Sequence, residues 1–197
     1  MPTKTFYFDV ETTGLDPKKN AIIQLAYIVD IDGKCIEDGE FLIAPHPNDV
    51  IEPTALEVNG RNADEISKFT PPGDTLKKII KFLNKYIDQY DRTDKFYPAG
   101  YNVKFDVDFL KAFFEKCGHK YFGSYFNYKF IDPLTVFYWH DWIGSIKLPN
   151  YKLETVAEKY GIELDAHDAV NDIKATRELI LRFKNTTVIP GLEGAFE

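Results

Sequence analysis

The first predicted strand of the chain ends in two carboxylates. Residues 6–10 are rich in aromatic side chains and lack a helical period, which predicts a strand, and Asp9 and Glu11 lie at its end. Side chains two positions apart on a strand point to the same face. Crowded carboxylates need something positive beside them, and a hard divalent cation is the usual partner. The pattern therefore predicts a metal site, and the alternative is an exposed strand end without such a role.

Two more carboxylates fall on apolar stripes of predicted helices. Asp106 shares a stripe with Leu110 and Phe113, and Asp172 lies on the core stripe of the last predicted helix. An ionised carboxylate in such a place is costly unless it is paired or bound to metal. The alternatives are stabilisation by the helix dipole for Asp106 and a buried salt bridge for Asp172. Asn102 is expected to cap or brace the loop before Asp106.

The residues beside these carboxylates are of the types that a hydrolytic site needs. His167 precedes Asp172 by five positions at the start of the last predicted helix, and an imidazole titrates near neutral pH. Thr12, Thr13 and Gly14 follow the paired carboxylates directly. A turn broken by glycine can hold the end of a strand through its backbone N–H groups.

The order of predicted elements indicates a mixed α/β sheet. Three strands linked by hairpin-type connections come first, with an Asp-Gly turn signal at residues 32–33, and later strands alternate with helices. This order predicts a five-stranded sheet, its first three strands antiparallel, flanked by helices. The five strands are expected at residues 6–10, 21–30, 34–43, 95–99 and 128–131. One domain is expected over residues 1–184, followed by a tail at 185–197.

Composition limits the kinds of partner and the cellular compartment that fit this chain. The net charge of −7 argues against a broad surface that coats nucleic acid. Bound cations can still reverse the sign of the electrostatic field where the end of a nucleic-acid strand would bind. Two cysteines without metal-ligand spacing fit a reduced, cytoplasmic compartment. No apolar run approaches ~18 residues, so no membrane span is expected. Most lysines are expected to be solvated helix faces, including Lys104, Lys111, Lys116 and Lys120.

The motifs together resemble the DEDDh exonucleases, the family of the proofreading epsilon subunit of bacterial DNA polymerase III. The likeness spans about residues 3–184 and differs at Asn59 and Tyr101, where many relatives carry His, and at Lys104, where a small residue is common. These differences concern substrate contacts more than metal ligands. The three motifs are residues 8–15, 101–106 and 166–172, and residues 55–60 and 151–161 resemble the segments between them.

The resemblance implies an RNase H-like fold and a 3′–5′ exonuclease that acts on single-stranded nucleic acid, with DNA favoured. Nucleoside 5′-monophosphates would be released, in proofreading or repair. Two Mg²⁺ or Mn²⁺ ions would support the reaction, and His167 would be the general base. The implied metal ligands are Asp9, Glu11, Asp106 and Asp172. The implied substrate contacts are Thr12, Thr13, Gly14, Leu15, Asn59, Asn102 and Phe105.

Three alternatives stay open at this point. An RNA-trimming exonuclease resembling RNase T or oligoribonuclease would use the same metal site, and the 2′-hydroxyl is what would distinguish its substrate. A non-catalytic module associated with a polymerase would have no use for the acidic cluster. A magnesium-dependent phosphatase or nucleotidase would not shorten an oligonucleotide. The expected partners are 3′ ends of single-stranded DNA or RNA, with a DNA polymerase as a candidate protein partner.

Overall fold

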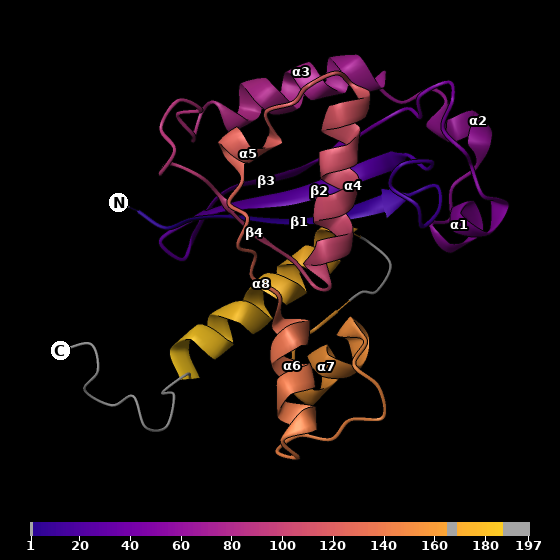
Figure 1. Ribbon diagram of the computed structural model, residues 1–197. Coiled ribbons are helices and arrows are strands. Elements are labelled where there is room, and N and C mark those ends of the chain that lie inside the picture. Colours follow the sequence, from indigo (N-terminus) through magenta and orange to yellow (C-terminus); the bar gives the residue numbers. More distant parts are fainter. Residues whose placement is uncertain (1, 165–168, 187–197) are drawn as a thin grey trace.

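A mixed sheet forms the centre of the computed structural model, which describes residues 2–164 and 169–186. The strand order is β3-β2-β1-β4, and β1 pairs antiparallel with β2 and parallel with β4 (Figure 1). β2 and β3 are antiparallel, so the expectation for the first three strands is confirmed. The strands are β1 (Lys4–Thr12), β2 (Ile22–Ile31), β3 (Lys34–Leu42) and β4 (Tyr97–Ala99).

The fifth predicted strand is wrong: the described residues contain four. The 126–131 segment touches the β4 edge only through isolated bridges, from Phe126 to Phe96 and from Ile131 to Ala99. Two local features interrupt the pairing. Pro98 in β4 has no N–H to donate, and the Asn127 side chain accepts the N–H of Lys129 at 3.0 Å, which turns the chain.

Eight helices lie within the described residues. Each predicted helix is present, and proline occupies the first turn of three of them, where its missing N–H costs nothing. They are α1 (Pro53–Val58), α2 (Ala63–Ile66), α3 (Pro72–Leu83), α4 (Val103–Lys116), α5 (Phe122–Tyr125), α6 (Pro133–Trp142), α7 (Leu153–Lys159) and α8 (Ala169–Thr186). No helix among them is long and apolar enough to cross a membrane.

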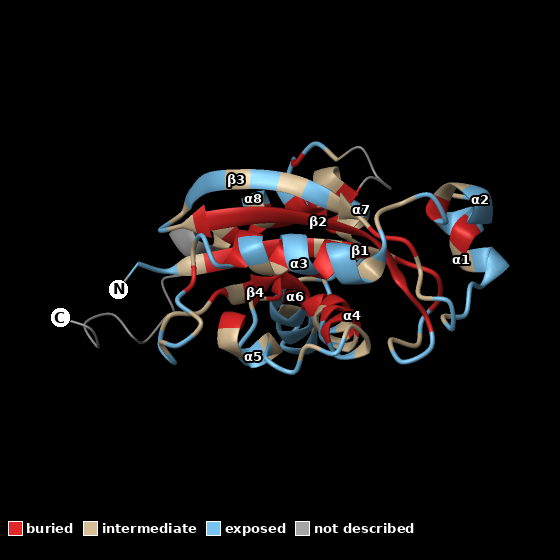
Figure 2. Cartoon of the chain, turned by 90° about the horizontal axis from the view of Figure 1, so that it is seen from above, coloured by how far each residue is buried: buried red, intermediate tan, exposed pale blue. Residues whose placement is uncertain are grey.

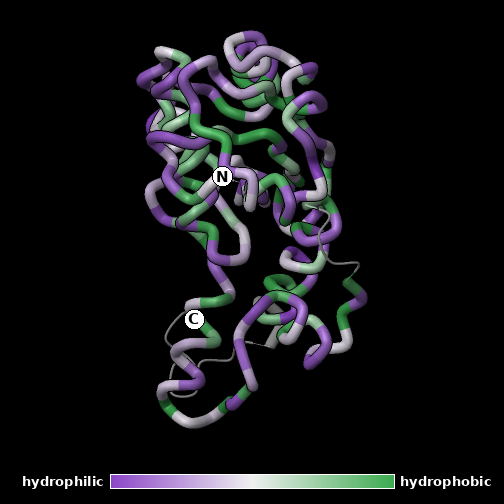
Figure 3. Tube along the Cα trace, turned by 90° about the vertical axis from the view of Figure 1, so that its right-hand side faces the viewer, coloured by the Kyte–Doolittle hydropathy of each residue, from purple (hydrophilic) through white to green (hydrophobic). Residues whose placement is uncertain are grey.

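The helices cover both faces of the sheet. Phe6 and Phe8 of β1 pack on one face against the apolar sides of α3 and α4, whereas Tyr7 packs on the other face against Ala169 and Ile173 of α8. β2 is buried along its length and β3 forms the exposed edge (Figure 2). A smaller apolar cluster joins α6 and α7 to α8, below the sheet (Figures 1 and 3). The alternation along β1 decides which residues face α8.

A buried ion pair fixes α8 on the sheet. Arg177 of α8 donates from Nε and Nη2 to Asp30 Oδ2 of β2, at 2.9 and 2.6 Å, and also from Nη2 to the Gly33 carbonyl. Asp30 is buried, so loss of its partner would leave an uncompensated charge. This anchor sets how far along β1 the first turn of α8 lies.

The separation of a 185–197 tail from the domain stays a prediction, because residues 187–197 lie outside the described part of the chain.

Candidate active site

Two of the predicted carboxylates lie on the face of β1 that α8 covers. Asp9 and Glu11 follow Tyr7 on alternate positions, and Tyr7 packs against Ala169 in the first turn of α8. Asp172 belongs to the same turn of α8. The charges of both Glu11 and Asp172 act on Asp9 strongly enough to raise its pKa, so these three carboxylates are neighbours.

Asp106 reaches the same place from the open edge of β1. β4 pairs with β1 only up to Tyr7, which leaves the later backbone groups of β1 without a partner strand on that side. There the Val10 N–H donates to Asp106 Oδ1 at 3.0 Å. Asp106 is 3% exposed. A Cβ on Gly100 would lie 2.9 Å from the Phe8 carbonyl, so the absence of a side chain lets the chain pass close to β1 before α4 begins.

Burial and mutual repulsion dominate the electrostatics of this cluster. Burial first, then the charges of Glu11 and Asp172, raise the pKa of Asp9 from 3.8 to about 8. Burial and the charge of Asp9 raise the pKa of Asp106 well above its usual range, against the opposing effect of the Val10 N–H. Both shifts mean that the fold resists negative charge here, which a bound cation would relieve.

The donor set fits a hard divalent ion. Four carboxylates supply only oxygen ligands, which is what Mg²⁺ and Mn²⁺ prefer. Within residues 2–164 and 169–186, no three acidic, imidazole or thiol groups are already gathered as a metal site. Repulsion between carboxylates opposes such gathering in the absence of a cation. Asp9, Glu11, Asp106 and Asp172 therefore form a set of nearby ligands that an ion would still have to draw together.

The turn after β1 is held from inside by its own hydroxyls. Thr13 Oγ1 donates to the Val50 carbonyl at 2.7 Å and accepts the Ala21 N–H at 2.9 Å. Thr12 Oγ1 donates to the Gly14 carbonyl at 2.7 Å. Both threonines are buried, so their hydroxyls hold the shape of the turn from the protein side.

The other predicted contact residues differ in exposure. Leu15 is 79% exposed beside the turn. Asn59 donates from Nδ2 to the Thr12 carbonyl at 2.8 Å, which ties it to the turn. Phe105 is half-buried and its ring lies 4.7 Å from that of Phe109. His167 lies outside the described residues, so its position stays a prediction.

Asn102 occupies the N-cap position of α4 without capping it. Its backbone is left-handed, with φ of 59°, and its side chain makes no capping bond. Its N–H instead donates to Asp132 Oδ1 at 3.1 Å, and the same oxygen accepts the Leu134 N–H at 3.0 Å. Asp132 thus joins the start of α6 to the start of α4. Nothing local in the sequence indicates that Asp132 has a partner in both helices.

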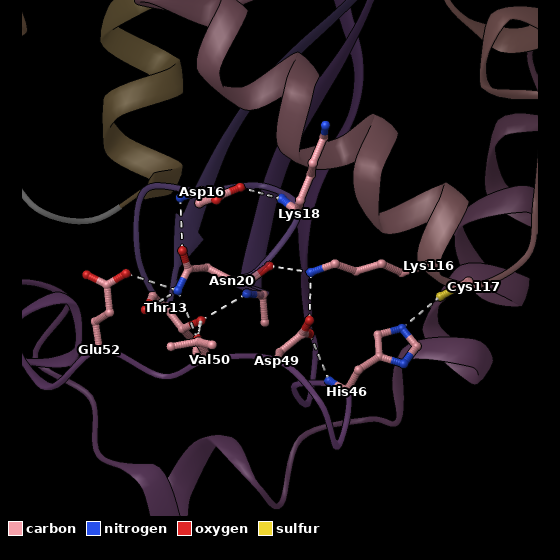
Figure 4. Close-up of polar contacts among 11 residues, drawn as sticks. Thr13, Asp16, Lys18, Asn20, His46, Asp49, Val50, Glu52, Lys116 and Cys117 are labelled. Atoms are coloured by element: carbon pink, nitrogen blue, oxygen red, sulfur yellow. Dashed lines mark hydrogen bonds and ion pairs between the residues drawn. The ribbon is translucent and has the colours of Figure 1, made fainter.

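Asn20 and Lys116 support the turn after β1 (Figure 4). Nothing in the sequence indicated this role for either residue. Asn20 Nδ2 donates to the Val50 carbonyl and to Glu52 Oε1, at 3.0 and 3.2 Å. Lys116 donates to the Asn20 carbonyl and to Asp49 Oδ1, both at 2.6 Å. The expectation that Lys116 is a solvated lysine is wrong, since it closes a largely buried ion pair. Partners 67 to 96 positions away leave no local pattern in a sequence.

Replacing Gly14 with Ala should disturb this turn. A Cβ there would lie 2.3 Å from both Asn20 Nδ2 and Glu52 Oε1, so the brace must shift. Crowding of this kind costs about 1–3 kcal/mol, and we expect that loss in denaturant unfolding together with weaker substrate binding. Gly73→Ala is the matched control, because its Cβ meets nothing within 4 Å. Equal behaviour of the two variants would contradict a crowded, functional turn.

Comparison with known proteins gives the same picture as the geometry. A family model described as "Exonuclease" matches residues 6–180. The DNA polymerase III PolC-type protein of Halalkalibacterium halodurans is 30% identical over 179 residues, which cover 89% of this chain and 11% of that protein. The corresponding protein of Thermotoga petrophila is 26% identical over 176 residues, with the same coverage. The chain therefore spans about a tenth of the length of these curated relatives.

The fold is that of solved exonuclease structures. E. coli exonuclease I in complex with a dT13 oligonucleotide matches with a TM-score of 0.75 and 20% identity, over 98% of this chain and 42% of that one. The zinc-bound form of an E. coli ExoI–ssDNA complex matches with a TM-score of 0.78 and 21% identity, over 99% and 43%. At this identity the likeness concerns the fold, and it agrees with the mixed sheet flanked by helices.

Proposed function

The chain belongs to the exonuclease family, and on that premise we propose that it is a metal-dependent 3′–5′ exonuclease acting on single-stranded nucleic acid, with DNA favoured. The observation that carries the proposal is the meeting of carboxylates from three elements. Asp9 and Glu11 come from β1, Asp106 from α4 and Asp172 from α8. A chain that only packs has no reason to bring these acids together at a cost in stability.

Asp9, Glu11, Asp106 and Asp172 would hold two Mg²⁺ or Mn²⁺ ions. Ions bound there would activate a water and neutralise charge on the phosphodiester. The protein orients its ligands in advance: the Val10 N–H holds one oxygen of Asp106. The Arg177–Asp30 pair fastens α8 to β2, and Ala169 in the turn that carries Asp172 packs against Tyr7 of β1.

Thr12, Thr13 and Gly14 would hold the terminal sugar. Leu15 or Phe105 would pack on the terminal base, and Asn59 and Asn102 would complete the contacts. The exposure of Leu15 and Asn102 supports this role. A nucleotide held this way presents its 3′-terminal phosphodiester to the carboxylates, and a nucleoside 5′-monophosphate would leave.

His167 would accept the proton of the attacking water. Its Ala variant should lower turnover by about 10²–10⁴-fold, the usual contribution of a general base. Metal affinity, measured by calorimetry with Mn²⁺, should stay nearly unchanged. If the variant loses its metal instead, His167 is a ligand and the proposed role is wrong.

A direct assay tests the proposed function. We expect a single-stranded DNA 12-mer, labelled at its 5′ end, to be shortened stepwise from the 3′ end with Mg²⁺ and left intact with a chelator. The RNA 12-mer of the same sequence tests the RNA-trimming alternative, which predicts a reversed preference. Release of phosphate without shortening would indicate a phosphatase or nucleotidase. An intact 12-mer under all conditions would overturn the proposal.

Proofreading or repair, beside a DNA polymerase, is the role that we propose for this activity. The curated relatives carry the name DNA polymerase III PolC-type, which supports a polymerase partner and a cytoplasmic location. A 3′-terminal mismatch should then be removed faster than a matched end. Equal rates on matched and mismatched ends would point to a different role.

A further inference from the structure

A groove of about 410 Å³ lies between one side of α4 and the segment that follows α5. Figure 1 shows the chain that descends from α5 toward α6 beside α4. Both segments contribute residues to the lining of the groove. The α4 wall and its continuation contribute Lys104, Val107, Asp108, Lys111, Glu115, His119 and Lys120, and the facing wall contributes Phe122, Gly123, Phe126, Asn127, Tyr128 and Phe130.

The groove is basic although the protein is acidic. Lys104 pairs with Asp108, so those two charges cancel. Lys111 and Lys120 are exposed and make no ion pair within the described part of the chain. One glutamate, Glu115, opposes them. A net positive groove on a chain of net charge −7 favours an anionic ligand.

Exposed aromatic rings lie on the wall opposite these lysines. Tyr128 is 86% exposed and Phe130 is 40% exposed, so neither ring is needed to fill the core. Lys129 Nζ lies 5.8 Å from the centre of the Tyr128 ring, within reach of a cation–π contact. Aromatic rings beside lysines are the combination that holds single-stranded nucleic acid, with bases stacking and phosphates paired.

The groove begins beside the proposed active site. Lys104 and Asp106 share the first turn of α4, and Lys111 lies about 10 Å further along the helix axis at ~1.5 Å per residue. Asp106 faces the sheet, whereas Lys104 and Lys111 lie on the groove side. A strand whose 3′ end lies at Asp106 can therefore pass the start of α4 and enter the groove within a few nucleotides.

We infer that this groove binds the part of the substrate strand a few nucleotides upstream of its 3′ end. Lys111 and Lys120 contact phosphates, and Tyr128 stacks on a base. The inference rests on the proposed exonuclease function and adds a second point of attachment for longer strands. Lys104, Lys111 and Lys120 are exposed, as expected for solvated helix faces, and the inference adds a binding role for Lys111 and Lys120.

The test compares strand lengths. The Lys111→Glu/Lys120→Glu double variant and Tyr128→Ala should each lower kcat/KM for a 12-mer, mainly through KM, by about tenfold for the double variant. The loss on the 12-mer should be at least fivefold larger than on a trinucleotide, which is too short to fill the groove. Lys34→Glu/Lys68→Glu is the matched control, with the same charge change at exposed lysines outside the groove.

Binding without cleavage separates this inference from the proposed function. Fluorescence anisotropy with a labelled DNA 12-mer in chelator should show weaker binding by the groove variant. Its plot of log affinity against log salt should be less steep by about 1.4, the value for two lost phosphate contacts on a single strand. The inferred role of the groove would be overturned if kcat/KM fell equally for the 12-mer and the trinucleotide, or if the control variant lost as much as the groove variant. Failure of the wild-type chain to cleave would overturn the exonuclease proposal, and the anisotropy would still decide on the groove.

Discussion

Asp9→Asn and Asp172→Asn are each expected to lower exonuclease turnover by at least about 10³-fold. Asparagine keeps the size of the side chain and removes the charge that holds a cation. Loss of several kcal/mol of metal-ion stabilisation corresponds to this factor, at ~1.4 kcal/mol for each tenfold change in rate. The two residues come from β1 and α8, so equal effects would show that both elements contribute to one site.

The measurement is single-turnover release of the 3′ nucleotide from a single-stranded DNA 12-mer. Asp74→Asn is the control, because Asp74 also lies in the first turn of a helix but is exposed and paired with Lys77. It should retain full turnover. Substantial activity in a pure preparation of either site variant would refute the assignment of the acidic cluster as the metal site.

The sequence could single out these four carboxylates because the signals that mark them are local. The i, i+2 spacing of Asp9 and Glu11 and the helical stripes of Asp106 and Asp172 follow from the periods of strands and helices. The meeting of all four also needs the order β2-β1-β4 and the crossing of α8 on β1, which spacing alone does not give. The family resemblance supplied that arrangement.

The features that sequence reasoning missed depend on contacts between distant segments. The fifth strand failed because Pro98 and the Asn127 turn interrupt a pairing that β propensity at residues 128–131 favours. Lys116 looked like a solvated lysine, and only its distance to Asp49 in the fold shows otherwise. Propensity describes a residue's own segment, so a buried ion pair or a groove between two segments stays invisible to it.

Asp9→Asn is also expected to stabilise the metal-free protein, by on the order of 3 kcal/mol at pH 8–9. The folded-state pKa of Asp9 is about 8, against 3.8 in the unfolded chain, so the fold favours its neutral form. That favourable contribution is complete below about pH 4 and is lost as the pH rises through 8. The expected gain is smaller than ~1.4 kcal/mol per pKa unit would give, because Asp9 keeps some contact with solvent.

Urea unfolding of both proteins from pH 4 to 9, in chelator, would measure the difference. At pH 4 the two should be nearly equally stable, and the advantage of the variant should grow toward pH 9. Added Mg²⁺ should reverse the order, since it stabilises only the chain that binds it, by RT ln(1 + [Mg²⁺]/Kd). A variant no more stable than the wild type at pH 9 would mean that the carboxylates do not repel one another as their positions imply. It would follow that the acidic cluster does not destabilise the metal-free fold.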